Sequence, residues 1–97
     1  MLSSLADVRT TLVPVFDAYG ISRAILFGSL AKETSGENSD LDLLVDSSLR
    51  GLQFVGFMEA VRQAAGMPVD VFDIKHIEAG SRIDQEIRST GVTIYKA

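Results

Sequence analysis

Hydrophobic positions along the chain follow two periods, one typical of helices and one typical of strands. Spacings of three and four residues recur in three segments, which predicts three amphipathic helices. Pro14 lies inside the first and is expected either to kink that helix or to split it into two. In the second, the periodic positions are Leu52, Val55, Met58 or Phe57, Val61 and Ala65. Val55, Met58 and Val61 are interpreted as core residues, with a partner surface as the alternative for some of them. The predicted helices are 5–19, 52–65 and 77–89.

Four short apolar runs separate or follow these helices and predict strands. The first run ends in Gly28-Ser29, and the second opens with Asp40 and Asp42. Because side chains alternate between the two faces of a strand, both aspartates should lie on the face opposite the apolar residues of that run. The predicted strands are 21–27, 41–45, 69–74 and 92–95.

The connections between the strands predict how the strands pair. The connection 29–39 is short for a parallel crossover, so we expect antiparallel pairing of the first two strands. The connection 46–68 contains a whole helix, which permits parallel pairing of the second and third strands. We therefore expect an α/β (α+β) fold, a single domain over 1–97 with a mixed sheet of about four strands and helices packed mainly on one face.

Composition and charge exclude several classes of protein. Hydrophobic residues make up 46% of the chain and charged residues 23%, which is typical of a globular domain, and the absence of cysteine excludes disulfides and thiolate zinc sites. The net charge is −4 with scattered Lys and Arg, which argues against duplex nucleic acid as the main partner. No segment approaches the ~18 apolar residues of a membrane span, so we expect a soluble cytoplasmic protein without a membrane partner.

The aspartates are the first candidates for chemistry. Each alone could be a turn residue, but two like charges on one face are unfavourable unless a cation lies between them. Oxygen ligands without nearby His or Cys favour Mg²⁺ or Mn²⁺ over Zn²⁺. Asp70 opens the strand predicted to neighbour Asp42 and supplies a third carboxylate, whereas Asp73 falls on the opposite face and is interpreted as solvated or as an ion-pair partner.

Gly28-Ser29 is the second candidate. Glycine lets the backbone approach an anion, and the amides of the following turn, with the Ser29 hydroxyl, can bind phosphate oxygens. A plain turn is the alternative for the pair taken alone. Phosphate donors that face a magnesium site would form a site for a nucleoside triphosphate.

Gly28-Ser29, ten residues, and then Asp40-Leu41-Asp42 resembles the GSX10DXD signature of minimal members of the DNA polymerase β nucleotidyltransferase superfamily. The resemblance covers nearly the whole chain, including the third aspartate, Asp70. It implies a nucleotidyltransferase-like mixed sheet that uses ATP as donor and two Mg²⁺ ions, with Mn²⁺ as an alternative. By position, it implies that Asp40 and Asp42 ligate both metals and that Asp70 completes the second metal site and acts as the base. The implied nucleotide-binding residues are Gly28, Ser29, Lys32 and Ser39.

The chain departs from the GSRARG form of many minimal members. Leu30 removes a donor and Glu33 adds a negative charge, although Lys32 can still offer a positive charge to the triphosphate. His76, the single histidine, is interpreted as a surface or helix-start residue.

In the resembling family, minimal nucleotidyltransferases are commonly paired with a HEPN toxin, and some transfer AMP to a tyrosine of that toxin. The resemblance therefore implies an antitoxin that modifies a HEPN-type partner with Mg·ATP. Leu30 and Glu33 motivate one alternative, an inactive fold that only occludes its partner. Transfer to a small molecule such as an aminoglycoside is a third hypothesis, ranked below the other two because we expect no second domain to hold such an acceptor. The sequence leaves oligomerisation open.

Overall fold

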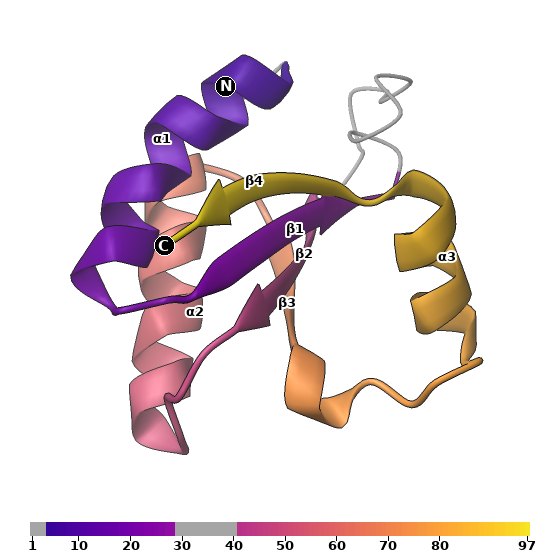
Figure 1. Cartoon of the computed structure of the whole chain (residues 1–97). Coiled ribbons are helices and arrows are strands. Elements are labelled where there is room, and N and C mark those ends of the chain that lie inside the picture. The colour runs from indigo at the N-terminus through magenta and orange to yellow at the C-terminus, as the bar shows by residue number, and fades with distance from the viewer. Residues whose placement is uncertain (1–3, 29–40) are drawn as a thin grey trace.

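The structure, a computed structural model, describes residues 4–28 and 41–97. Within these ranges a four-stranded sheet is flanked by helices (Figure 1). The elements in chain order are α1 (Leu5–Ala18), β1 (Arg23–Phe27), β2 (Leu41–Asp46), α2 (Leu52–Ala65), β3 (Val69–Asp73), the 3-10 helix η1 (Ile74–His76), α3 (Arg82–Thr90) and β4 (Val92–Lys96).

The strand order in the sheet is β3-β2-β1-β4. β1 pairs antiparallel with β2 on one side and with β4 on the other, and β2 pairs parallel with β3. Both predicted pairings are therefore confirmed. The helix α2 lies in the connection between the parallel strands, as a crossover between parallel neighbours requires.

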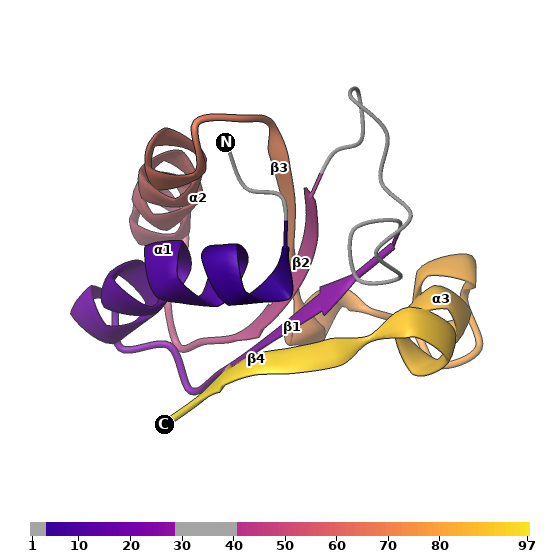
Figure 2. The same ribbon diagram turned by 90° about the horizontal axis from the view of Figure 1, so that it is seen from above.

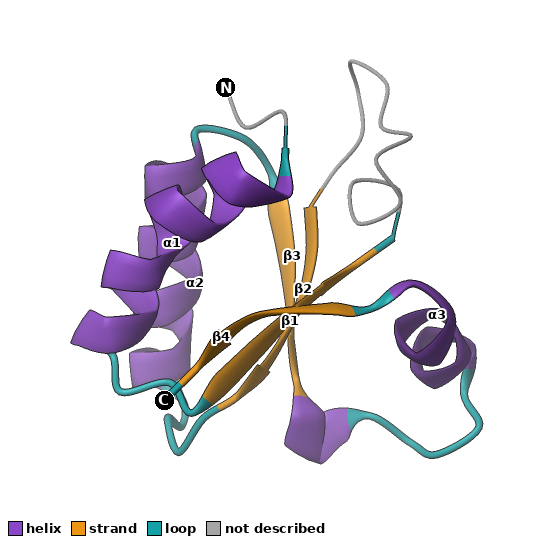
Figure 3. Ribbon diagram, turned by 45° about the horizontal axis from the view of Figure 1, so that its top comes forward, coloured by secondary structure: helices purple, strands orange, loops and turns teal. Residues whose placement is uncertain are grey.

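Two helices cover one face of the sheet and the third lies on the other. In Figure 2 and Figure 3, α1 and α2 lie together on one side of the strands and α3 lies on the opposite side. This confirms the expected α+β architecture with helices mainly on one face. The core fills the layer between the sheet and the α1–α2 pair, where inward residues of β1 and β2 meet both helices. Its fully buried members include Val8, Leu12, Phe16, Leu26, Leu41, Leu43, Val45, Phe57 and Val61.

The first helix continues through its proline. α1 is not split at Pro14, and Thr10, whose carbonyl loses its helical partner, is exposed and can be solvated. Its cap is Ser4, whose hydroxyl accepts a hydrogen bond from the Asp7 amide at 3.2 Å.

The core-facing stripe of α2 agrees with the predicted one only in part, because Val61 and Ala65 are buried as predicted and Val55 is not. Val55 is 52% exposed, whereas Phe57, Val61 and Ala65 are buried at spacings of four. The Phe57 ring packs 6.2 Å from the Phe16 ring, centroid to centroid, which turns α2 so that Val55 points outward.

The third helix begins later than predicted. Residues 77–81 are not helical, and α3 starts only after Ser81, whose hydroxyl accepts from the Asp84 amide at 3.2 Å. Gly80, with φ of +81°, has a left-handed conformation that a right-handed helix cannot contain, just before this cap. None of the helices that the structure describes is long and apolar enough to cross a membrane.

Candidate functional site

The ends of three neighbouring strands meet at one end of the sheet. Phe27, the last residue of β1, pairs with Asp42 of β2, and Asp42 pairs with Asp70 of β3. Gly28 follows directly after β1, so it lies at the same end. Because in-register partners on adjacent strands are only about 5 Å apart, the sheet brings two of the predicted carboxylates and the predicted glycine together.

Asp42 points away from the main core. Its neighbours Leu41 and Leu43 are fully buried beneath α1 and α2, so alternation places the Asp42 side chain on the face of the sheet that carries α3. Asp70, as the register partner of Asp42, shares that face. The predicted face for Asp42 is thus confirmed.

The carboxylates lie beside aromatic side chains. Phe27 and Phe72 occupy the same face, with ring centroids 5.8 Å apart, and Phe27 is only 3% exposed. Asp42 is half-buried, whereas Asp70 is exposed. The register thus places one half-buried and one exposed carboxylate side by side on neighbouring strands, where both offer oxygen donors to a cation.

Gly28 is constrained both by its backbone conformation and by its neighbour on β2. Its φ is +86°, a conformation that side chains rarely adopt, and a Cβ built on it would lie 2.5 Å from Oδ2 of Asp42. The Asp42 carboxylate therefore lies directly against the bare Cα of Gly28. No other residue type fits there without moving the carboxylate.

The Gly28 amide has a partner far away in sequence. It donates a hydrogen bond of 3.0 Å to Oγ1 of Thr90, the last residue of α3. Sequence reasoning missed Thr90, because a threonine at a helix end carries no signal for a contact 62 residues away.

The other predicted site residues lie outside the described ranges. These are Ser29, Lys32, Ser39 and Asp40, together with the departures Leu30 and Glu33. Over 4–28 and 41–97, no group of three or more His, Cys, Asp or Glu could hold a metal ion. Those ranges contain two of the three predicted carboxylates, Asp42 and Asp70.

Asp73 lies at the opposite end of the β2–β3 pair and is not part of this site. It is 6% exposed, so its interpretation as solvated is wrong, and its interpretation as an ion-pair partner is confirmed by Lys75 Nζ at 3.6 Å. Its carboxylate also accepts from the Lys75 amide at 2.9 Å. His76 is exposed at the end of η1 and, with Lys75 and Arg50, lines a cavity of about 410 Å³ that none of the candidate site residues borders.

The mixed β3-β2-β1-β4 sheet with its flanking helices is a nucleotidyltransferase-like fold. Comparison with known families agrees. Residues 10–97 match the family described as Polymerase beta, Nucleotidyltransferase, and the chain belongs to that family.

Two similar proteins carry more specific descriptions than the family does. A protein named as a putative protein adenylyltransferase, from Methanocaldococcus jannaschii, is 30% identical over 78 residues, which are 76% of this chain and 82% of the relative. A solved structure described as a putative minimal nucleotidyltransferase superposes with a TM-score of 0.73 at 24% identity, covering 92% of this chain and 94% of the other.

Two further solved structures of the same fold contain toxin–antitoxin pairs. One, described as a toxin–antitoxin with AMP-PNP, has a TM-score of 0.77 at 18% identity and covers 92% of this chain and 73% of the other. The second is a tri-AMPylated Shewanella oneidensis HEPN toxin in complex with MNT antitoxin, with a TM-score of 0.72 at 14% identity, covering 96% and 73%. At these identities the likeness shows the fold.

Proposed function

We propose that this protein is a cytoplasmic antitoxin that transfers AMP from Mg·ATP to a hydroxyl of a HEPN-type partner protein. The observation that carries the proposal is the contact between the Asp42 carboxylate and the bare Cα of Gly28, in register with Asp70. This contact and the register bring the end of β1 and the carboxylates of β2 and β3 together at one end of the sheet. The cations that accompany a triphosphate need oxygen donors gathered in this way.

The residues fit divalent cations. Asp42 and Asp70 offer hard oxygen donors on neighbouring strands, and Asp40 would add a third carboxylate two residues before Asp42. When bound, Mg²⁺ supplies positive charge that neutralises the triphosphate and lowers the pKa of the acceptor hydroxyl. Lys32 and the hydroxyls of Ser29 and Ser39 are the proposed additional contacts of the nucleotide.

The proposed transfer assigns one step to Asp70. The acceptor oxygen attacks the α-phosphorus, the bond from that phosphorus to the pyrophosphate oxygen breaks, and the Asp70 carboxylate takes the hydroxyl proton. Asp70 is the exposed member of the pair, so a hydroxyl on the surface of another protein can reach it. Asp42 is half-buried against Gly28, and we assign it the role of holding the cations.

The partner and donor are proposed from the relatives. One is named as an adenylyltransferase, one structure of the same fold contains AMP-PNP, and another holds an AMPylated HEPN toxin. The same chemistry in this chain would attach AMP to its own HEPN partner.

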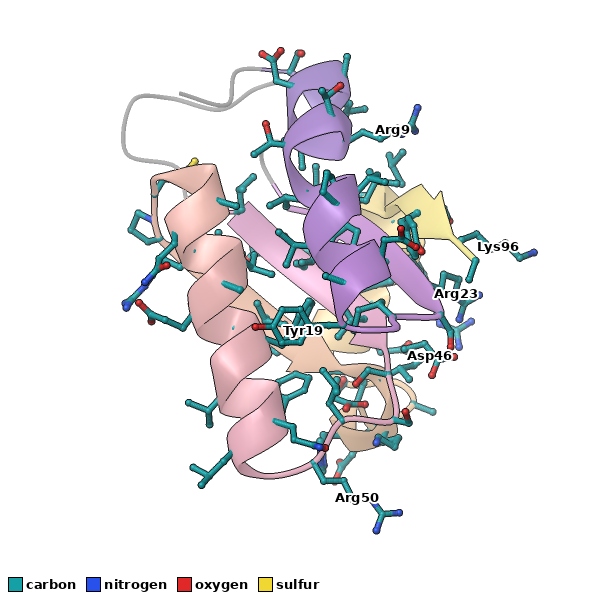
Figure 4. The ribbon with its side chains drawn as sticks, turned by 90° about the vertical axis from the view of Figure 1, so that its left-hand side faces the viewer. Arg9, Tyr19, Arg23, Asp46, Arg50 and Lys96 are labelled. Atoms are coloured by element: carbon teal, nitrogen blue, oxygen red, sulfur yellow. The ribbon has the colours of Figure 1, made fainter. Side chains whose placement is uncertain are left out.

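Intact-mass spectrometry tests this proposal. The purified protein is incubated with its copurified HEPN partner, ATP and Mg²⁺, and the partner should gain one or more AMP-sized increments. Asp42→Asn should abolish the gain. Asp46→Asn is the matched control, because Asp46 lies on the same strand and face but at the opposite end, beside Arg23 (Figure 4). Its transfer should equal that of the wild type.

Two results would reject the proposal: no mass gain with the wild type, or full transfer by Asp42→Asn. If the Asp40→Asn/Asp42→Asn variant still silences the partner without any mass gain, the protein acts by occlusion instead.

A further inference from the structure

One hydroxyl connects α3 to the candidate site. Oγ1 of Thr90 accepts a 3.0 Å hydrogen bond from the Gly28 amide and donates a 2.9 Å hydrogen bond to the Glu86 carbonyl. The hydroxyl's single proton is therefore directed at Glu86, which leaves a lone pair aimed at Gly28. The orientation of the Thr90 side chain is fixed by its own helix.

The helix end is itself held tightly on β1. The Gly91 amide donates to the Ile87 carbonyl at 2.7 Å, which closes α3 just after Thr90. A Cβ built on Gly91 would lie 3.0 Å from Cγ2 of Ile25, in the middle of β1. This close packing leaves Thr90 little freedom to move relative to the end of β1.

The bond to Thr90 determines what Gly28 can contribute. Its amide proton is already donated to Thr90, so Gly28 serves the site through its shape rather than as a phosphate donor. The same bond fixes the peptide plane between Phe27 and Gly28, and thus the place where the chain turns to φ of +86° against Oδ2 of Asp42. A shift of this peptide would move the Cα on which the carboxylate rests.

We propose that Thr90 is a positioning residue of the nucleotide site, whose hydroxyl holds the Gly28 peptide at the place that the Asp42 carboxylate requires. The inference rests on the proposed function, because it assigns Thr90 an effect on nucleotide affinity. It extends the site to a helix that the sequence motif does not include.

The test compares Thr90→Val with Thr90→Ser. Valine has nearly the shape of threonine but neither accepts from Gly28 nor donates to Glu86, whereas serine keeps the hydroxyl. Binding of Mg·AMP-PNP is measured by titration calorimetry well below the unfolding midpoint of each variant. Thr90→Val should bind at least about tenfold more weakly than the wild type, since it leaves the Gly28 amide without its acceptor, and Thr90→Ser should bind within about twofold.

A matched control and a local readout separate positioning from general destabilisation. Thr93→Val makes the same chemical change at an exposed position of β4 and should leave affinity unchanged. Exchange of the Gly28 amide proton, followed by NMR, should be faster in Thr90→Val and near wild type in Thr90→Ser. If Thr90→Val does not fold, Thr90→Ala replaces it, because alanine removes the hydroxyl with less bulk.

The outcomes distinguish the two proposals. A wild type that does not bind Mg·AMP-PNP overturns the proposed function and this inference with it. A wild type that binds, together with unchanged affinity of Thr90→Val, overturns the inference alone. Equal losses in Thr90→Val and Thr90→Ser would overturn it as well, because the hydroxyl would then not be responsible.

Discussion

Gly28→Ala probes the contact on which the proposed function rests. The substitution places a methyl carbon 2.5 Å from Oδ2 of Asp42, roughly 1 Å inside an ordinary carbon–oxygen contact. It also forces a non-glycine residue to φ of +86°, which costs about 1–2 kcal/mol. The collision must be relieved by moving a half-buried carboxylate, so the total should exceed the backbone cost alone.

Gly20→Ala separates these two contributions. Gly20 has a similar φ of +67°, but a Cβ there meets nothing within 4 Å, so this variant has the backbone cost without the collision. For a domain of this size, each 1 kcal/mol lowers the melting temperature by about 4–8 °C. Gly20→Ala should therefore lose about 4–16 °C by circular dichroism, and Gly28→Ala should lose more.

The binding measurement gives the sharper contrast. Gly28→Ala should weaken Mg·AMP-PNP binding by at least about tenfold, because the displaced Asp42 carboxylate no longer faces the site, while Gly20→Ala should bind as the wild type does. Equal losses of melting temperature in the two variants, with affinity retained in both, would refute the reasoning. That result would mean that the carboxylate moves aside freely and that its position against Gly28 has no function.

Three further predictions test the core, the acid stability and the metal site. Phe57→Ala should cost about 3–5 kcal/mol in urea unfolding because Phe57 is fully buried, whereas Val55→Ala at an exposed position should cost within about 0.5 kcal/mol. The hydrogen bond from the Gly80 amide holds the pKa of Asp84 below its ordinary value of 3.8. The charged Asp84 carboxylate therefore stabilises the fold fully above about pH 3.8, and this stabilisation is lost as the pH falls through the lowered pKa. The stability difference between wild type and Asp84→Asn should accordingly shrink on acidification below pH 4 in a pH series of thermal melts. Mn·AMP-PNP at about a hundred times its Kd should stabilise the wild type by about 2.7 kcal/mol, and Asp70→Asn should lose most of that gain.

Local patterns predicted a large share of this fold. The period of two in β2 placed Asp42 opposite Leu41 and Leu43, and connection lengths predicted both strand pairings. These predictions succeed because alternation and loop closure depend only on residues near one another in the chain. Once β2 and β3 are parallel and in register, Asp42 and Asp70 must become neighbours.

Tertiary packing determined the features for which the local sequence allowed more than one conformation. The apolar residues of α2 allow more than one inward face, and the ring of Phe57 against Phe16 selected the face that leaves Val55 exposed. Likewise, α3 begins at Arg82 rather than at residue 77, because Gly80 takes a left-handed conformation and Ser81 caps the helix that follows.

The sequence by itself determined the family, the order of the elements and the face of β2 on which Asp42 lies, since motif spacing and periodicity are properties of neighbouring residues. Only the tertiary structure determined which groups Gly28 contacts. Its bare Cα lies against Asp42 and its amide is held by Thr90, two contacts made from different strands and helices. The bond to Thr90 depends on the packing of α3 onto β1, which brings together residues 62 positions apart. The contact with Asp42 depends on the pairing of β1 with β2, and neither contact follows from a periodic pattern in the sequence.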